Sequence, residues 1–135
     1  MTWLYEHGLD EFDESHIGDN VGFVYCITNN TTGQKYIGKK LFTKSKTRQV
    51  KGKKKKSRVS SDWMDYYGSN EVLKEEVKQN GPENYTREIL HLCKTRSWMS
   101  YYETYEIFSR HALLSDHYYN AWCSCRIRKD HLKKT

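Results

Sequence analysis

Two short segments rich in β-branched and aromatic residues, with a polar stretch between them, constrain the fold of this chain more than any other feature. The first is Gly22–Thr28 and the second is Lys35–Lys39. The residues between them, 29–34, are Asn, Asn, Thr, Thr, Gly and Gln, and Asn and Gly tolerate the left-handed backbone of tight turns. The pattern predicts an antiparallel β-hairpin that carries Tyr25 and Tyr36 on adjacent strands.

Further elements follow downstream of the hairpin. Capping residues at 60–62 predict a short helix. A second helix is expected to begin at Ser69 or Asn70 and to end at Gly81. A third strand is expected over residues 84–93.

The third strand and the last expected helix each carry a predicted apolar face. In the third strand, Leu90 and Leu92 are expected on the same side because strand side chains alternate. Ser97 is expected to cap the longest helix, whose predicted apolar face consists of Trp98, Tyr101, Tyr102, Tyr105 and Phe108. The order of elements predicts an α+β domain with a small three-stranded antiparallel sheet flanked by helices. A chain of 135 residues suits one domain.

Charge is unevenly distributed along the chain. Residues 1–20 hold six acidic residues and no Lys or Arg, whereas residues 39–58 hold eleven Lys or Arg and no acid. The basic block is expected to form a long loop or broken helix and favours a polyanionic partner, most simply nucleic acid; the alternative is a solvated loop without a partner. The expected division is an irregular acidic leader at 1–20, a folded domain at 21–122 with a basic insertion at 39–60, and a basic tail at 123–135.

The cysteines and the apolar segments indicate the compartment. Cys26, Cys93, Cys123 and Cys125 are too sparse for the disulfide framework of a small secreted domain. The Cys123-x-Cys125 pair leaves a zinc site open, but structural zinc usually uses wider Cys spacing, so zinc is not expected. No apolar run reaches the roughly 20 residues that span a bilayer, and the N-terminus lacks the pattern of a secretory signal. We therefore expect a cytoplasmic protein with no membrane association.

The hairpin carries a motif pair. Phe23-Val24-Tyr25, ten intervening residues and Tyr36-Ile37-Gly38 resemble the two elements that name the GIY-YIG nuclease superfamily, although the first element differs at two of three letters. Three downstream segments resemble further family motifs: Tyr67-Gly68-Ser69, Glu103-x-x-x-Ile107 and Tyr119-Asn120. The resemblance covers residues 22–120 and is closest to the phage-encoded branch, which shares the Tyr-Ile-Gly-Lys-Lys and Glu-x-x-x-Ile patterns.

The resemblance implies a GIY-YIG fold in residues 21–122 and a metal-dependent endonuclease that hydrolyses phosphodiester bonds in DNA. Glu103 would hold the metal, and a single carboxylate suits Mg²⁺, with Mn²⁺ as a substitute. Tyr25 would act on the attacking water as general base, or only orient it, and Tyr36 would bind the same water or a phosphate oxygen. Because a free phenol has a pKa near 10, Lys39, Lys40 and the metal are expected to lower the tyrosine pKa. Tyr67 would contact phosphate and Asn120 would brace the site; for each of these tyrosines the alternative is packing alone.

The basic residues have two expected roles. The family places an arginine shortly after the second tyrosine to stabilise developing charge; Lys40, Lys46 and Arg48 are candidates, and Arg48 is preferred for its two-pronged guanidinium. The remaining set would track the DNA backbone without reading bases and would make binding steeply salt-dependent: Lys39, Lys46, Lys51, Lys53, Lys54, Lys55, Lys56 and Arg58.

The expected protein is a stand-alone enzyme, phage- or mobile-element-like, that acts in the cytoplasm of the host cell. A homodimer is left open, since it would allow cleavage of both strands. The alternative function is a catalytically inactive nucleic-acid-binding module on the same fold.

Overall fold

The fold is described by a computed structural model that covers residues 2–5 and 8–133. Met1, Glu6, His7, Lys134 and Thr135 lie outside the described residues, so the acidic leader and the basic tail are each described in part. The strands are β1 (Trp3–Tyr5), β2 (Asp10–Phe12), β3 (Gly22–Asn29), β4 (Lys35–Leu41), β5 (Thr43–Val50), β6 (Lys53–Ser60) and β7 (Tyr85–Cys93). The helices are α1 (Glu71–Asn80), α2 (Arg96–Ser109) and α3 (Lys129–Leu132), with short 3₁₀ turns η1 (Glu14–His16), η2 (Trp63–Asp65), η3 (Pro82–Asn84) and η4 (Ala112–Leu114).

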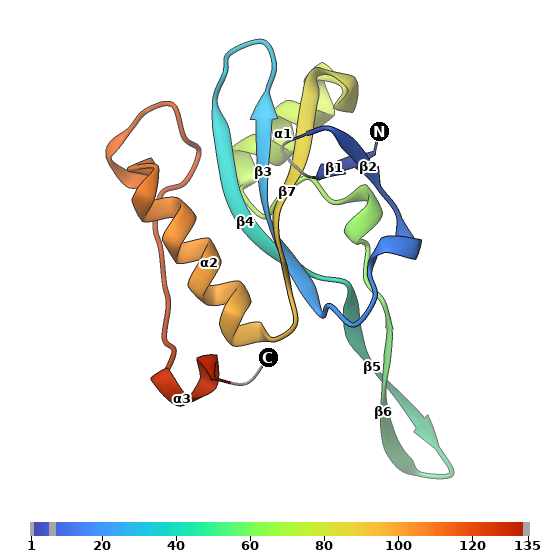
Figure 1. The fold of residues 1–135 in the computed structure, drawn as a ribbon. Coiled ribbons are helices and arrows are strands. Elements are labelled where there is room, and N and C mark those ends of the chain that lie inside the picture. The colour runs from blue at the N-terminus through green and yellow to red at the C-terminus, as the bar shows by residue number, and fades with distance from the viewer. Residues whose placement is uncertain (1, 6–7, 134–135) are drawn as a thin grey trace.

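The central sheet runs in the order β2-β1-β7-β3-β4 (Figure 1). The predicted hairpin is confirmed as β3 and β4, and the α+β class is confirmed. The sheet has five strands rather than the expected three, because β1 pairs in parallel with β7 and antiparallel with β2. The N-terminal segment is therefore not irregular: Trp3 is buried in the core, and its indole donates a hydrogen bond to the Trp63 carbonyl at 2.7 Å.

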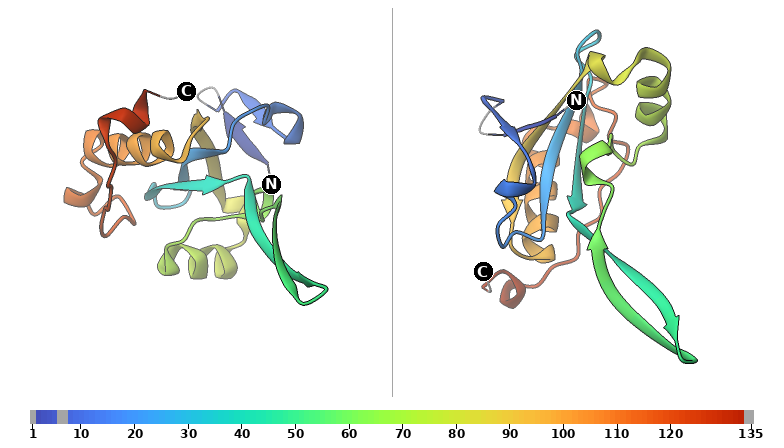
Figure 2. Two further views of the ribbon diagram at one scale, coloured as in Figure 1. Left: turned by 90° about the horizontal axis from the view of Figure 1, so that it is seen from below. Right: turned by 90° about the vertical axis from the view of Figure 1, so that its right-hand side faces the viewer.

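Both faces of the sheet are covered, so β3 buries residues on both sides. Phe23, Tyr25 and Ile27 point into one core, which contains α1 and the N-terminal strands. Val24 and Cys26 point into a second core, which α2 covers with Met99 and Ile107. Figure 2 shows α1 and α2 on opposite sides of the sheet. The two hairpin motifs are thus carried on the middle layer of three.

Two sequence-based expectations, one about side-chain packing and one about a helix cap, are wrong. Leu92 packs in the first core and Leu90 with the second, because the β3–β7 register shifts by a bulge beside Val24 and Tyr25. Thr95, not Ser97, caps α2, accepting a hydrogen bond from the Trp98 N–H.

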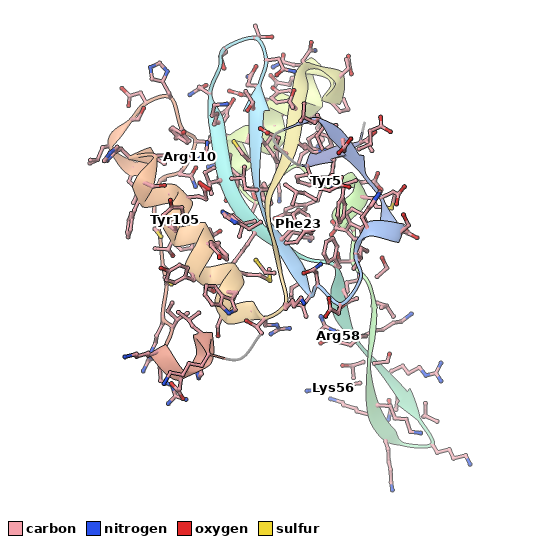
Figure 3. The ribbon with its side chains drawn as sticks, viewed as in Figure 1. Tyr5, Phe23, Lys56, Arg58, Tyr105 and Arg110 are labelled. Atoms are coloured by element: carbon pink, nitrogen blue, oxygen red, sulfur yellow. The ribbon has the colours of Figure 1, made fainter. Side chains whose placement is uncertain are left out.

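The buried face of α2 also differs from the predicted one. Met99 and Ile107 are buried, whereas Tyr101, Tyr105 and Phe108 are exposed. Figure 3 shows Tyr105 on α2. Of the predicted apolar face, Trp98 and Tyr102 do pack against the second core.

The basic block folds as a separate two-stranded ribbon, β5–β6, which projects from the body of the molecule (Figures 1 and 2). The expected loop or broken helix is wrong. Lys51 and Gly52 join the strands with φ of 51° and 76°, and two positive φ values are what the favoured two-residue hairpin turn requires. At the base of the ribbon, Phe42 is buried and its carbonyl accepts a hydrogen bond from the Ser61 N–H at 2.9 Å.

The cysteines and helices complete the description. Cys26, Cys93, Cys123 and Cys125 are free thiols, and burial raises the pKa of Cys93 to about 12. Of the helices in residues 2–5 and 8–133, none is long and apolar enough to cross a membrane.

Candidate active site

A pocket of about 570 Å³ opens at the outer edge of β4, between that strand, α2, the segment that leads into α1 and residues 120–124. Three of the candidate catalytic residues line it: Tyr36, Glu103 and Asn120. Its other lining residues are Ile37, Lys39, Tyr66, Ser69, Asn70, Ile107, Ala121, Trp122, Cys123 and Ser124. The pocket therefore brings together segments that are far apart in the sequence.

Glu103 projects from α2 into this pocket with its charge poorly compensated. Its side chain is 17% exposed, and the nearest cation is the Lys39 ammonium, whose Nζ lies 3.9 Å from Glu103 Oε1. Burial raises the pKa of Glu103, although Lys39 lowers it. Glu106, three residues on, is instead held by His91 at 3.2 Å and by Arg110 at 3.1 Å. Glu103 is thus the α2 carboxylate that remains open to a cation.

Tyr36 connects β4 to the beginning of α1. Its hydroxyl forms a hydrogen bond with Ser69 Oγ at 2.8 Å, and Asn70 caps α1 by accepting from the Leu73 N–H at 3.0 Å, as predicted. Burial raises the pKa of Tyr36, so its phenol is neutral at pH 7. A neutral phenol at the pocket wall is able to donate a hydrogen bond.

Tyr25 lies behind the pocket and is completely buried. Its phenol lies over Gly38, where the Cβ of any other residue would collide with the hydroxyl and the ring. This contact explains why the second motif needs glycine at this position. Because Tyr25 does not line the pocket, it has no direct contact with the solvent there.

The expected lowering of the tyrosine pKa by lysines is wrong. Burial raises the pKa of Tyr25 well above its ordinary value, and the neighbouring phenols of Tyr66 and Tyr36 raise it further. The two lysines point elsewhere: Lys39 donates to Ser100 Oγ at 2.9 Å, and Lys40 pairs with Asp62 at 2.7 Å and lies over the Tyr66 ring.

Asn120 completes the edge of β4 with its side chain. The amide oxygen accepts from the Ile37 N–H at 3.0 Å, and the amide nitrogen donates to the Ile37 carbonyl at 2.9 Å. The adjacent Tyr119 N–H donates to the Lys35 carbonyl at 2.8 Å. These bonds hold the chain after η4 against the strand, and this chain forms the outer wall of the pocket from Asn120 through the exposed Trp122 to Ser124.

Tyr66, rather than the predicted Tyr67, faces the pocket. The Tyr67 ring packs on the Arg87 guanidinium, with its centroid 4.2 Å from Arg87 Cζ. Arg87, buried in β7, also donates to the carbonyls of Met64 and Tyr66 at 2.9 Å each. The Tyr66-Tyr67 pair alone does not reveal which ring faces inward, because that depends on the buried arginine of a distant strand.

The preferred arginine, Arg48, is not at the pocket. It lies on β5 opposite Lys55, and Lys46 lies opposite Ser57, both exposed on the ribbon. Lys39 is the only Lys or Arg among the described residues that line the pocket. The expected DNA-binding residues of the ribbon are likewise exposed and away from Glu103: Lys51, Lys53, Lys54, Lys55, Lys56 and Arg58.

The donor atoms of the pocket suit a hard cation. Glu103 contributes a carboxylate, and Tyr36 and Ser69 contribute hydroxyl oxygens to the same walls. Within residues 2–5 and 8–133 no group of three or more His, Cys, Asp and Glu side chains forms a metal cluster, so Glu103 would be the one carboxylate ligand. Mg²⁺ keeps much of its water shell and uses one or two carboxylates with phosphate oxygens, and this donor set fits that preference.

Cys123 and Cys125 form separate weak hydrogen bonds. Cys123 Sγ donates to Thr104 Oγ1 at 3.8 Å, and Cys125 Sγ donates to the Ser100 carbonyl at 3.6 Å.

A hairpin with Tyr36 at its edge, a glycine beneath a buried phenol and a helical glutamate across the edge is the arrangement expected of a GIY-YIG nuclease domain. The comparison with family models agrees: the model described as "Putative endonuclease segE, GIY-YIG domain" matches residues 3–123. The chain therefore belongs to the SegE GIY-YIG family, which confirms the predicted superfamily and its phage-encoded branch. The match begins within β1. Neither the curated proteins nor the solved structures include a match.

Proposed function

We propose that the chain is a metal-dependent endonuclease that hydrolyses phosphodiester bonds in DNA, with the scissile phosphate in the pocket beside β4. The observation that carries this proposal is Glu103: a largely buried carboxylate whose one ion pair, with Lys39, is long at 3.9 Å, and which shares an open pocket with Tyr36. Burial destabilises a charged carboxylate, and a bound cation stabilises it more in such surroundings than in open solvent.

Glu103 would hold Mg²⁺, with Mn²⁺ as a substitute. When bound, the ion supplies Lewis-acid polarisation of the phosphoryl oxygen and charge neutralisation at the leaving oxygen. Tyr36 and Ser69, which already bond each other at 2.8 Å, orient the water or a phosphoryl oxygen from the opposite wall.

Lys39 takes the role that the resemblance assigns to an arginine. Its ammonium lies beside Glu103 and is fixed by Ser100, so a phosphate at Glu103 would meet a positive charge already in place. Preorganised charge of this kind stabilises the negative charge that develops on the phosphoryl oxygens.

Tyr25 and Asn120 position other groups. The neutral Tyr25 phenol, packed on Gly38, supports the strand that presents Tyr36. Asn120 fixes the same strand at Ile37. Neither role needs a deprotonated phenol, and this differs from the general-base role expected for Tyr25.

The ribbon would hold the DNA backbone. Two-stranded ribbons with little burial are marginal in water, and like charges placed opposite each other, such as Arg48 and Lys55, are destabilising. A polyanion relieves this repulsion, so the ribbon gains stability by binding DNA. We further propose a phage- or mobile-element-like enzyme acting in the host cytoplasm, with a homodimer for cleavage of both strands.

The test is a nicking assay on supercoiled plasmid with purified protein, in Mg²⁺, in Mn²⁺ and in EDTA. We expect conversion to open-circular DNA with either ion and none in EDTA. Binding of the plasmid without nicking in either ion would overturn the nuclease proposal and leave a nucleic-acid-binding module.

A further inference from the structure

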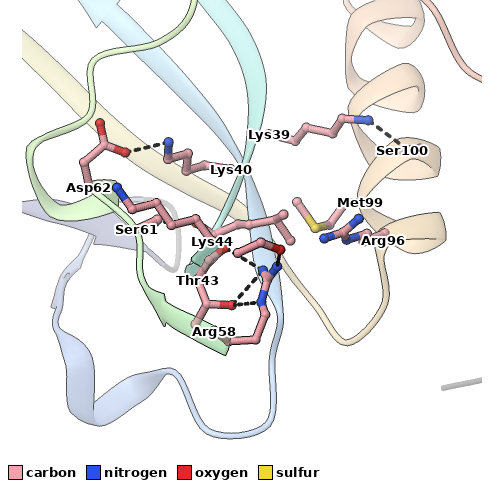
Figure 4. Close-up of a pocket in the computed structure, with 12 residues that line it drawn as sticks. Lys39, Lys40, Thr43, Lys44, Arg58, Ser61, Asp62, Arg96, Met99 and Ser100 are labelled. Atoms are coloured by element: carbon pink, nitrogen blue, oxygen red, sulfur yellow. Dashed lines mark hydrogen bonds and ion pairs between the residues drawn. The ribbon is translucent and has the colours of Figure 1, made fainter. Parts of the chain in front are cut away.

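A second pocket, of about 550 Å³, lies between the base of the ribbon, β4 and the beginning of α2 (Figure 4). Five cations from these segments line it: Lys39, Lys40, Lys44, Arg58 and Arg96. Asp62 is the one carboxylate among the described residues that line it. We call this the basic pocket.

The positive charge of the basic pocket is largely uncompensated. Asp62 is already paired with Lys40 at 2.7 Å. Lys44, Arg58 and Arg96 form no ion pair with any residue in the described part of the chain. Cations gathered in one hollow without counter-ions repel each other, so an anion bound there is strongly favoured.

Arg58 is held in place by neutral groups. Its Nη1 donates to Ser45 Oγ at 2.8 Å, its Nε to Thr43 Oγ1 at 3.1 Å and its Nη2 to the Thr43 carbonyl at 2.8 Å. These bonds fix the guanidinium without neutralising it, and a fixed side chain loses little entropy when it binds. The guanidinium of Arg96, across the pocket, forms no hydrogen bond with the described residues, so it is available to a phosphate.

Lys39 connects this pocket to the active site, because it lines both. Phosphates of one DNA strand recur about every 3.4 Å along the helix axis, so two hollows with a common wall are able to take two phosphates of one strand. We propose that the basic pocket binds a backbone phosphate close to the scissile one and thereby sets the position of the strand over Glu103. This inference rests on the proposed function and names Arg58 and Arg96 as the residues that recognise the second phosphate.

The first experiment measures binding of a short duplex in EDTA, where no cleavage is expected. We compare Arg58→Gln/Arg96→Gln with a charge-matched control, Lys54→Gln/Lys56→Gln, whose residues lie on the outer ribbon and line neither pocket. The pocket variant is expected to lose roughly tenfold or more in affinity, because it removes charge-assisted hydrogen bonds in a hollow. The control is expected to lose about two- to threefold. Equal losses would overturn the proposal.

The second experiment locates the anion by NMR. Inorganic phosphate added to ¹⁵N-labelled protein is expected to shift the Nε–H resonances of Arg58 and Arg96 saturably; shifts elsewhere with none at these two arginines would overturn the proposal.

The binding experiment also includes the single variant Arg96→Gln, which breaks no side-chain hydrogen bond. A loss of DNA affinity in this variant is therefore not a folding defect of the ribbon. The readouts do not need cleavage. If the protein never nicks DNA but the pocket variant loses more affinity than the control, the basic pocket stands and the nuclease proposal fails. If the protein nicks DNA but both variants lose the same affinity, the nuclease proposal stands and the basic pocket fails.

Discussion

Glu103 and Glu106 lie three residues apart on α2, and their surroundings give them different tasks. Glu106 is tied to His91 and Arg110, so its charge is used within the fold. Glu103 has Lys39 at 3.9 Å and an otherwise open pocket. Its raised pKa means that the folded protein binds its proton more tightly than the unfolded chain does. Stability contributed by the protonated form is therefore lost as pH rises through the raised pKa.

We expect Glu103→Gln to abolish nicking while DNA binding is retained, because only the carboxylate is lost. At pH 7 its melting temperature should equal or exceed that of the wild type, since the cost of burying the charge is removed. Glu106→Gln is the control: it should keep activity but lower stability by about 1–2 kcal/mol, because hydrogen bonds to charged partners are weakened. Nicking and thermal unfolding of both variants provide the check, and a nicking-competent Glu103→Gln would exclude Glu103 as the metal ligand.

The two motif tyrosines should also differ in their response to loss of the hydroxyl. Tyr36→Phe is expected to lower the single-turnover rate by roughly 100-fold, the scale of losing one preorganised donor, because its phenol faces the pocket. Tyr25→Phe should have the smaller effect on rate, since its buried hydroxyl does not reach the pocket. Rates measured for the two variants under the same conditions decide this; a larger loss for Tyr25→Phe would restore its role as general base.

At the residue scale, motif spacing predicts site roles for Glu103, Tyr36 and Asn120, and the structure places all three at one pocket. Spacing does not reveal that Tyr66 rather than Tyr67 faces the pocket. That orientation depends on Arg87 of another strand, which packs on the Tyr67 ring and donates to the Tyr66 carbonyl. It also does not indicate burial, and burial reverses the expected direction of the tyrosine pKa.

The ribbon is the element that sequence patterns missed. Lysine has low β-propensity, so a run of lysines does not resemble a strand. The available signal was the alternation of hydroxyl and basic residues over Thr43–Arg48, followed by a Lys51-Gly52 turn. The short strand β1 was missed for another reason: it is formed by pairing with β7, which is distant in the sequence.

Replacing Lys53, Lys54, Lys55 and Lys56 with Gln should weaken DNA binding at every sequence and flatten its salt dependence. For each DNA phosphate that the protein no longer neutralises, the slope of log affinity against log salt becomes shallower by roughly 0.9. A matched control replaces four cations of the C-terminal segment, Arg126, Arg128, Lys129 and Lys133, and is expected to change the slope less. Fluorescence anisotropy at several salt concentrations measures both, and weakening restricted to one DNA sequence would contradict a backbone role.

At the scale of the whole molecule, the N-terminal strands are part of the core. Trp3 is 1% exposed, packs against Phe23 and Tyr25, and lies with its ring over the Arg87 guanidinium. The β1 strand also covers the edge of β7, and an uncovered sheet edge promotes aggregation. The acidic segment therefore has a structural task that its charge alone does not suggest.

Trp3→Ala is expected to lower the free energy of unfolding by about 3–5 kcal/mol, as for other large-to-small core substitutions. Leu9→Ala, in the same segment but 81% exposed, should change it by less than about 0.5 kcal/mol. Denaturant unfolding of both variants measures the difference. Unchanged stability in Trp3→Ala would mean that the N-terminal strands are dispensable.

The closed base of the ribbon allows the length of the ribbon to change separately from the structure of the domain. Phe42 and the Ser61–Phe42 backbone hydrogen bond close the domain where the ribbon leaves it, so residue pairs added to or removed from the outer ribbon would leave the packing of the domain unchanged. A longer or shorter arm would change how much of the duplex is covered while the cutting centre stays the same. Descendants of one such domain are thus free to diversify their footprint on DNA independently of their chemistry.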